Sequence, residues 1–185
     1  MILPLGSGGF PAIPGSQNEP LWEPGRFPLT LAPHIAYDDA LWTHAAPWTP
    51  RDKAGVVVFQ GGLYILGGQD MADVWRSSNG RDWTPLVTEA NWRGRHDFAR
   101  VAYDGRLWVF GGWKDRSTDA LNDVWYSSDG MSWSRQADHA PWPPRSPISV
   151  VFHDKIWIYS GKHTGFDDNW GGDLWQMTTG TMPTG

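Results

Sequence analysis

The chain contains no cysteine among its 185 residues. This absence excludes disulfide bridges, thiolate nucleophiles and cysteine-ligated metal sites, and it leaves the redox environment of the protein open. No apolar run approaches the roughly 18 residues of a membrane-spanning segment. The first ten residues, MILPLGSGGF, carry neither the basic segment nor the long apolar stretch of a secretory signal. The localisation is therefore unknown, and a secreted or cell-surface protein is the alternative if the native N-terminus lies upstream.

Basic residues are few and scattered. The chain has 15 Lys and Arg against 20 Asp and Glu, which gives a net charge of −5. A surface for nucleic acid or for an anionic membrane requires a clustered basic patch. We therefore expect neither nucleic acid nor a membrane among the partners.

Tryptophan is abundant instead. The chain has 14 Trp, together with 22 Gly and 15 Pro. Aromatic residues favour strands, whereas Gly and Pro favour turns. No long helical periodicity accompanies them, so the composition predicts an all-β chain.

Three tryptophans recur at a spacing of 50 residues in one local pattern. The pattern reads Asp73-Val74-Trp75, Asp123-Val124-Trp125 and Asp173-Leu174-Trp175. A fixed period of this size indicates one supersecondary unit copied along the chain. A residue that recurs in every copy is expected to build the copy. Functional residues should therefore be sought among those that do not repeat.

Each copy reads as a run of short antiparallel strands. The first strand, such as residues 55–59 or 148–152, is apolar at successive positions, which predicts that it is covered on both faces. A tight turn leads to a second strand, which ends in Gly67-Gly68 in the first copy. Such a pair supplies positive φ angles and room for another backbone. A third strand carries Asp-Val-Trp, and a turn at Asn79-Gly80 leads to a fourth.

These features together resemble the kelch repeat of β-propellers. The resemblance rests on the second strand ending in Gly-Gly, the variable loop, Asp-Val-Trp and a final Trp, and it covers about residues 48–180. It implies propeller blades around a central channel, with the first strand innermost. The predicted domains are an irregular Pro/Gly-rich arm over 1–28 and a kelch-repeat domain over 29–185, with units at about 43–83, 84–133 and 134–180 and a degenerate strand at about 34–42.

The number of units is small for this family. Kelch propellers usually have six or seven blades, whereas this sequence holds about three. An open arc leaves unpaired sheet edges and an exposed blade face. Three arrangements are compatible with the sequence. The chain is a fragment of a longer propeller, or it forms a homodimer that completes a six-bladed ring, or the incomplete arc docks on another protein. In the homodimer, each N-terminal strand would complete the third blade of the partner.

Two motifs that could suggest a ligand platform or catalysis are interpreted as structural. The Trp-x-x-Arg segments, such as Trp92 to Arg95, recur in each copy, which favours stacking of Arg on Trp between blades. The segment from Ser127 to Trp133 resembles the Asp-box turn of sialidases, which is itself structural. Asn79 replaces Asp129 in the first copy, as a turn permits. No His pair has metal-ligand spacing, so no metal and no cofactor are predicted.

Two kelch-type enzymes bear on the activity. The copper centre of galactose oxidases relies on a Cys–Tyr cofactor, which a chain without cysteine cannot form, so this chemistry is excluded. A sialic-acid mutarotase is another kelch-type enzyme, and no motif in the sequence supports or excludes it.

The candidate binding residues lie in two loops that do not repeat. Trp113 and Trp170 fall between the second and third strands, where the loop is long in copies two and three. In an antiparallel meander this loop shares one face with the segments 91–96 and 138–142. Aromatic rings among charges suit a binding surface. The alternative is that the two Trp residues cap adjacent blades and the charges are solvated. The candidates are Trp113, Lys114, Asp115, Arg116, His163, Phe166, Asp167, Asp168 and Trp170.

The sequence therefore predicts an interaction module that binds a protein or glycan partner through this loop face, without catalysis. The alternative is a carbohydrate-active enzyme such as a sialic-acid mutarotase-like isomerase. An enzyme requires a pocket near the axis in which several blades combine Arg with His or a carboxylate. A binding module requires a broader loop surface with exposed Trp113 and Trp170.

Overall fold

The structure is a computed structural model that describes residues 46–114, 120–159, 161–162 and 172–179. The chain divides into two compact units, residues 1–42 and 43–185, and all described residues belong to the second. The predicted arm, degenerate strand and unit boundaries stay predictions, and residues 1–28 and 34–42 lie outside the described ranges. None of the described residues forms a helix long and apolar enough to span a bilayer.

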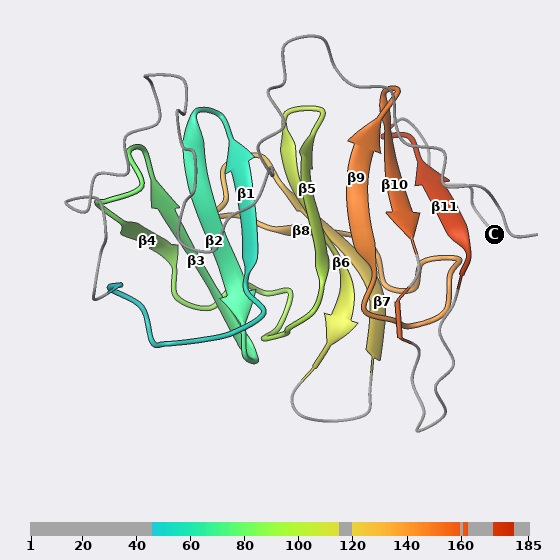
Figure 1. Cartoon of the computed structure of the whole chain (residues 1–185), viewed down its shortest axis with the longest axis horizontal. Helices are drawn as coiled ribbons and strands as arrows, with labels where there is room; N and C mark the ends of the chain where they lie inside the picture. The colour runs from blue at the N-terminus through green and yellow to red at the C-terminus, as the bar shows by residue number, and fades with distance from the viewer. Residues whose placement is uncertain (1–45, 115–119, 160, 163–171, 180–185) are drawn as a thin grey trace, which may run out of the picture. The chain divides into compact units, whose positions relative to one another are not determined.

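The described residues form eleven strands in three antiparallel sheets (Figure 1). Blade 1 contains β1 (Gly55–Phe59), β2 (Gly62–Gly68), β3 (Met71–Ser77) and β4 (Thr84–Val87). Blade 2 contains β5 (Ala99–Tyr103), β6 (Arg106–Trp113), β7 (Ala120–Ser127) and β8 (Ser134–Ala137). Blade 3 contains β9 (Ile148–Phe152), β10 (Lys155–Tyr159) and β11 (Leu174–Met177). The predicted all-β fold of partial propeller blades is confirmed.

The first hairpin of each blade closes on two residues with positive φ. In blade 2 these are Asp104 (φ 50°) and Gly105 (φ 66°), and in blade 1 they are Gln60 (φ 45°) and Gly61 (φ 67°). Two-residue turns of this kind match the right-handed twist of the strands. The hairpin turns predicted from the sequence are therefore present.

The glycine pair at the end of the second strand allows a close backbone approach. Gly111 has a φ of 51°, and a Cβ at this position would lie 2.7 Å from the carbonyl oxygen of Leu121. The ladder between β6 and β7 shifts register at this point, so the pair forms a bulge. Gly67 occupies the same position in blade 1, with a φ of 46°.

Neighbouring blades pack through their sheet faces. The core between blades 1 and 2 includes Leu66 and Val74 on one side and Val109 on the other, all three fully buried. The core between blades 2 and 3 includes Phe110 and Ile156. The first strands of the blades, β1, β5 and β9, are consequently neighbours (Figure 1).

Only in blade 2 does a described sheet lie on each side of the first strand, and even there Arg100 of β5 is exposed. In blade 1, Val58 of β1 is 68% exposed, and in blade 3, Val150 of β9 is 58% exposed. The prediction of two covered faces is therefore wrong for blades 1 and 3. The physical reason is that blade 2 has a neighbour on each side, whereas each outer blade packs against one described sheet only.

Candidate functional site

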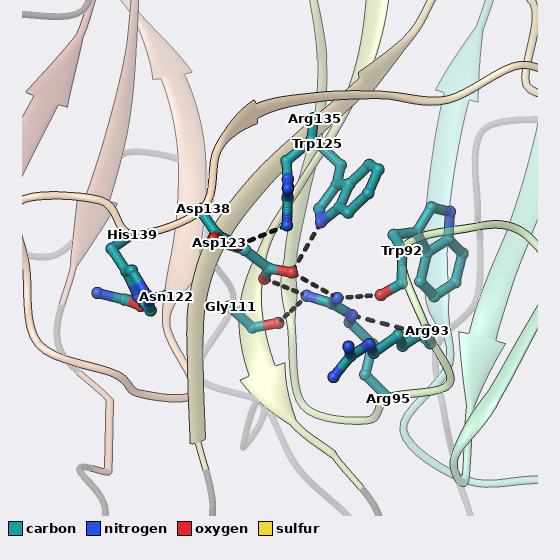
Figure 2. Close-up of polar contacts among 10 residues, drawn as sticks. All are labelled: Trp92, Arg93, Arg95, Gly111, Asn122, Asp123, Trp125, Arg135, Asp138 and His139. Carbon is teal, nitrogen blue, oxygen red and sulfur yellow. Dashed lines mark hydrogen bonds and ion pairs between the residues drawn. The ribbon is translucent and has the colours of Figure 1, made fainter.

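A buried arginine joins the segment before blade 2 to its third strand (Figure 2). Arg95 is fully buried, and its Nη1 and Nη2 atoms donate to the two carboxylate oxygens of Asp123 at 2.6 and 2.9 Å. Nη1 also donates to the carbonyl of Gly111 at 2.9 Å. The indole Nε1 of Trp125 donates to Asp123 at 2.7 Å. This bidentate geometry makes the pair both strong and directional.

The same arrangement occurs in the other two blades. Arg51 pairs with Asp73, and Arg145 pairs with Asp173. The Arg145 guanidinium lowers the pKa of Asp173 to about 2, because its hydrogen bond and that of the Trp175 indole outweigh the effect of burial. Recurrence in every blade indicates a structural role, as the sequence predicted.

The partner of this arginine is mainly the carboxylate. The guanidinium carbon of Arg95 lies 5.7 Å from the ring centroid of Trp92, so the predicted stacking is present in blade 2. The hydrogen bonds to Asp123 are nevertheless the stronger contact, since charge-assisted bonds exceed a cation–π contact in strength. The aspartate of the Asp-Val-Trp pattern is therefore there to hold the arginine.

The Asp-box-like segment is a turn. The Oδ1 atom of Asp129 accepts hydrogen bonds from the backbone N–H groups of Met131 and Ser132 at 2.7 and 2.8 Å. Burial acts to raise the pKa of Asp129, but these two bonds and one from the Ser127 hydroxyl outweigh it, so the pKa lies below its ordinary value. Asn79 accepts the corresponding backbone bonds in blade 1 through its amide oxygen. The interpretation as a turn is confirmed.

A cavity of about 590 Å³ lies beside the Arg95–Asp123 pair. It is formed by the segment before β5, the start of β7, and the end of β8 with the residues that follow. Its polar lining includes several groups that the recurrent scaffold does not use. These are Asn91, Arg93, Asn122, Arg135, Asp138 and His139.

The most constrained of these groups are His139 and Asn122 (Figure 2). The Nδ2 atom of Asn122 donates to the carbonyls of Ala140 and Trp142 at 3.2 and 2.9 Å. The amide oxygen is therefore the atom that faces His139 Nδ1, at 3.0 Å. Because an amide oxygen only accepts, Nδ1 must carry the proton of this bond. In the neutral imidazole, Nε2 is then the basic nitrogen.

The remaining groups supply charge of both signs. Arg135 Nη1 lies 2.6 Å from Asp138 Oδ1, and the Arg135 guanidinium lies over the ring of Trp125, 5.7 Å from its centroid (Figure 2). Arg93 has a positive φ of 63°, which a non-glycine residue rarely adopts. The Asn91 amide donates to the carbonyl of Trp133 at 3.1 Å. The cavity thus offers donors and acceptors on several elements.

Blade 1 carries a cavity at the corresponding place, and its lining is different. That cavity has a volume of about 330 Å³ and includes Thr49, Ala72 and Glu89. In the repeat these residues correspond to Arg93, Asn122 and His139, respectively. The recurrent Asp and Trp line both cavities, as Asp73 and Trp75 in blade 1 and as Asp123 and Trp125 in blade 2. The polar set of blade 2 is therefore not repeated in blade 1.

The two described loop candidates, Trp113 and Lys114, do not themselves line this cavity. Trp113 ends β6 and pairs with Ala120, which lines the cavity. The backbone of Trp113 exchanges two hydrogen bonds with His96, at 2.9 and 3.0 Å. Trp113 and Lys114 are both half-buried. The other candidates lie outside the described residues: Asp115, Arg116, His163, Phe166, Asp167, Asp168 and Trp170.

Sequence reasoning missed the polar residues of the cavity itself. The segments 91–96 and 138–142 were expected on the functional face, but Asn122 and Arg135 were not singled out. The signal that finds them is departure from the repeat, since Asn122 stands where blade 1 has Ala72. Among the described residues, no cluster of three or more His, Asp or Glu side chains could hold a metal ion.

Comparison with known proteins supports the fold. No family model matches the chain, and no curated protein matches it. Among solved structures it is similar to one titled "Structure of YjhT", with a TM-score of 0.54 and 22% sequence identity. The match covers 63% of this chain and 36% of that one, so the chain spans little more than a third of its structural neighbour. At this identity the likeness shows the propeller-type fold and nothing finer.

Proposed function

We propose that the chain is an interaction module that binds its partner through the face that carries the β6–β7 loop, without catalysis. The observation that carries the proposal is the cavity of blade 2, whose polar groups are absent from the matching cavity of blade 1. A scaffold that repeats does not explain Asn122 or His139. A ligand for which these groups are the recognition elements does.

Of the two partner classes, protein and glycan, the cavity favours a glycan. Its volume lies within the range of about 300–1,000 Å³ that holds small ligands. Amide, guanidinium, carboxylate and imidazole groups together supply the donors and acceptors that sugar hydroxyls require. The charge of Arg135 is balanced by Asp138, which suits a largely neutral polar ligand.

The place of the cavity in the fold supports binding over catalysis. Its lining residues belong to β7, β8 and the adjoining segments, and none of them lies on the neighbouring first strands β1, β5 and β9. Apart from Asn91 and Arg93, which precede β5, the cavity draws on blade 2 and the segment that follows it. A convergence of several blades on the axis, as an enzyme of this architecture requires, is not what this lining provides.

A second candidate is a carbohydrate-active isomerase of the sialic-acid mutarotase type. The observation in its favour is His139, whose Nδ1 is held by Asn122 so that Nε2 is the basic nitrogen. Interconversion of sugar anomers requires a group that removes and returns a hydroxyl proton. An imidazole in this state can perform that transfer.

A glycan array tests whether the chain binds oligosaccharides. The probe is a panel of neutral and sialylated oligosaccharides, and the comparison is between His139→Ala and the matched variant Glu89→Ala in the blade 1 cavity. We expect His139→Ala to weaken binding and Glu89→Ala to preserve it. Binding by neither the parent chain nor the control would contradict a glycan ligand.

NMR of N-acetylneuraminic acid anomers separates the two functions, since an isomerase accelerates their exchange and a binding module does not.

A further inference from the structure

The outward face of blade 3, on the side away from blade 2, is largely apolar, and no described sheet packs on it. Cross-strand pairing places its side chains next to one another, because Ile148 pairs with Tyr159, which pairs in turn with Leu174. The exposed fractions are 63% for Ile148, 58% for Val150, 58% for Phe152, 46% for Tyr159 and 57% for Leu174. A contiguous apolar patch of this kind marks an interaction surface.

The corresponding face is buried in the other two blades. In blade 1, Leu66 and Val74 occupy the positions of Tyr159 and Leu174, and both are fully buried against blade 2. In blade 2 the residue at the position of Tyr159 is Phe110, which is fully buried against blade 3. The uncovered face of blade 3 is therefore built as one half of a contact between blades.

The other half of such a contact is uncovered on blade 1. Val56 and Val58 of β1 are 51% and 68% exposed. They belong to the face of blade 1 that points away from blade 2, together with the half-buried Leu63 and Ile65. In blade 2, Leu107 and Val109 occupy the positions of Leu63 and Ile65, and both are fully buried against blade 1. Blade 1 thus presents the face that receives a preceding blade.

The linker tryptophan of blade 1 supports this reading. Trp48 packs on Trp75 and Trp83, with ring centroids 5.7 and 4.9 Å away. Trp92 occupies the same position before blade 2 and packs on Trp133 in the same manner. It is completely buried in the core between blades 1 and 2. Trp48 remains half-exposed. The aromatic contacts of Trp48 are therefore in place, and a blade that would cover it is not among the described residues.

We propose that the outward face of blade 3 docks on the outward face of blade 1 of a second copy of this chain. The chain supplies both halves of the contact, and blade 2 stands between them, so the two halves cannot meet within one chain. The contact continues the blade-to-blade packing already present twice in the chain. It joins two different surfaces, and such a contact closes into a ring when the rotation between copies permits.

Solution mass and three substitutions test this pairing. Light scattering and sedimentation of the full chain over a range of concentrations should give twice the mass of one chain. Val150→Asp and Val58→Asp each place a charge in the contact, and each should weaken self-association at least about tenfold, since a buried unpaired charge is strongly unfavourable. Met131→Asp is the matched control, because Met131 is 51% exposed and lies in the β7–β8 turn. It should leave the mass unchanged.

Mixing the two disruptive variants identifies which faces meet. A mixture of Val150→Asp and Val58→Asp restores one intact contact between blade 3 of one copy and blade 1 of the other, so it should associate more tightly than either variant alone. Association that is lost with Val150→Asp and kept with Val58→Asp would mean that blade 3 pairs with itself, which overturns the proposal. A parent chain of single-chain mass at every concentration also overturns it, and indicates a cover from elsewhere in the same chain.

Hydrogen exchange tests the same pairing without substitutions, so its result does not depend on whether a variant folds. In hydrogen exchange of the parent chain, the amides of β9 and β1 should become more protected as concentration rises, while those of β4 should not change. Equal protection at all concentrations would contradict the pairing. Failure of this proposal leaves glycan binding untouched, because the cavity of blade 2 uses neither face.

Discussion

The Nδ1 atom of His139 lies 3.0 Å from the amide oxygen of Asn122, and both residues line one cavity. Asn122→Ala places in blade 2 the residue that blade 1 has at this position. We expect glycan affinity to fall about three- to tenfold, because the imidazole loses the bond that orients it. Titration calorimetry with the oligosaccharide selected on the array measures this loss.

The same substitution has a second consequence. The carbonyls of Ala140 and Trp142 lose their donor, which should lower the free energy of unfolding by about 1–3 kcal/mol. Asn122→Asp is the informative control, since it keeps the oxygen that faces His139 and removes the donor. If it binds as weakly as Asn122→Ala, orientation of His139 is not the cause.

Much of the fold follows from local sequence patterns. The hairpin at Asp104-Gly105, the positive φ of Gly111 and the turn at Asp129 each depend on residues that are adjacent along the chain, so composition and spacing predict them. The covering of β1 and β9 does not follow in this way. It depends on how many blades stack on each side, and no local pattern encodes that number.

The candidate site was only partly predictable for the same reason. Subtraction of the repeat leads to the loop after Trp113, whose cross-strand partner Ala120 lines the cavity, and a binding role for this loop stays a prediction. The bond between Asn122 and His139 joins a residue of β7 to a residue in the bend after β8. It requires that Asn122 direct its amide nitrogen to the backbone of that same segment. Strand register and bulges determine which of the non-repeating residues come into contact. The spacing of residues along the sequence does not.

The buried pair of Arg95 and Asp123 should dominate the stability of blade 2. Asp123→Asn removes the charge that balances a fully buried guanidinium, which we expect to cost about 3–5 kcal/mol. Asp138→Asn in the exposed pair with Arg135 is the matched control and should cost less than about 1 kcal/mol. Urea unfolding followed by Trp fluorescence gives both values. Similar costs for the two variants would contradict a structural role that is specific to Arg95.

The turn at Asp129 should tolerate asparagine and reject alanine. Asn79 makes the same backbone contacts through its amide oxygen, so Asp129→Asn should change stability by less than about 1 kcal/mol. Asp129→Ala leaves two backbone N–H groups without their acceptor and should cost about 1–3 kcal/mol. Thermal unfolding of both variants decides the matter. A large loss in Asp129→Asn would mean that the carboxylate charge itself is required.

Acid should reduce the stability that the contact between Arg145 and Asp173 contributes to the folded chain. The folded pKa of about 2 lies below the ordinary value of 3.8, so the unfolded chain binds the proton first as pH falls. The stabilisation is therefore fully present above about pH 4 and is lost as pH falls toward 2. Asp173→Asn should be less stable than the parent chain at pH 7, and the difference should shrink below about pH 4. A difference that stays constant down to pH 2.5 in urea titrations would contradict this linkage.

Trp113 should contribute to binding more than to folding. It is half-buried at the end of β6, and its bonds to His96 are made by the backbone, which alanine preserves. Trp108 is the matched control, because it is 2% exposed in the core between blades 2 and 3, and Trp108→Ala should cost about 3–5 kcal/mol. We expect Trp113→Ala to lose less than half of that free energy, with a clear fall in glycan affinity. If Trp113 instead caps the adjacent blade, Trp113→Ala should lose about as much stability as Trp108→Ala, and the folded fraction should keep its glycan affinity. Urea unfolding and glycan titration of the two variants separate these roles.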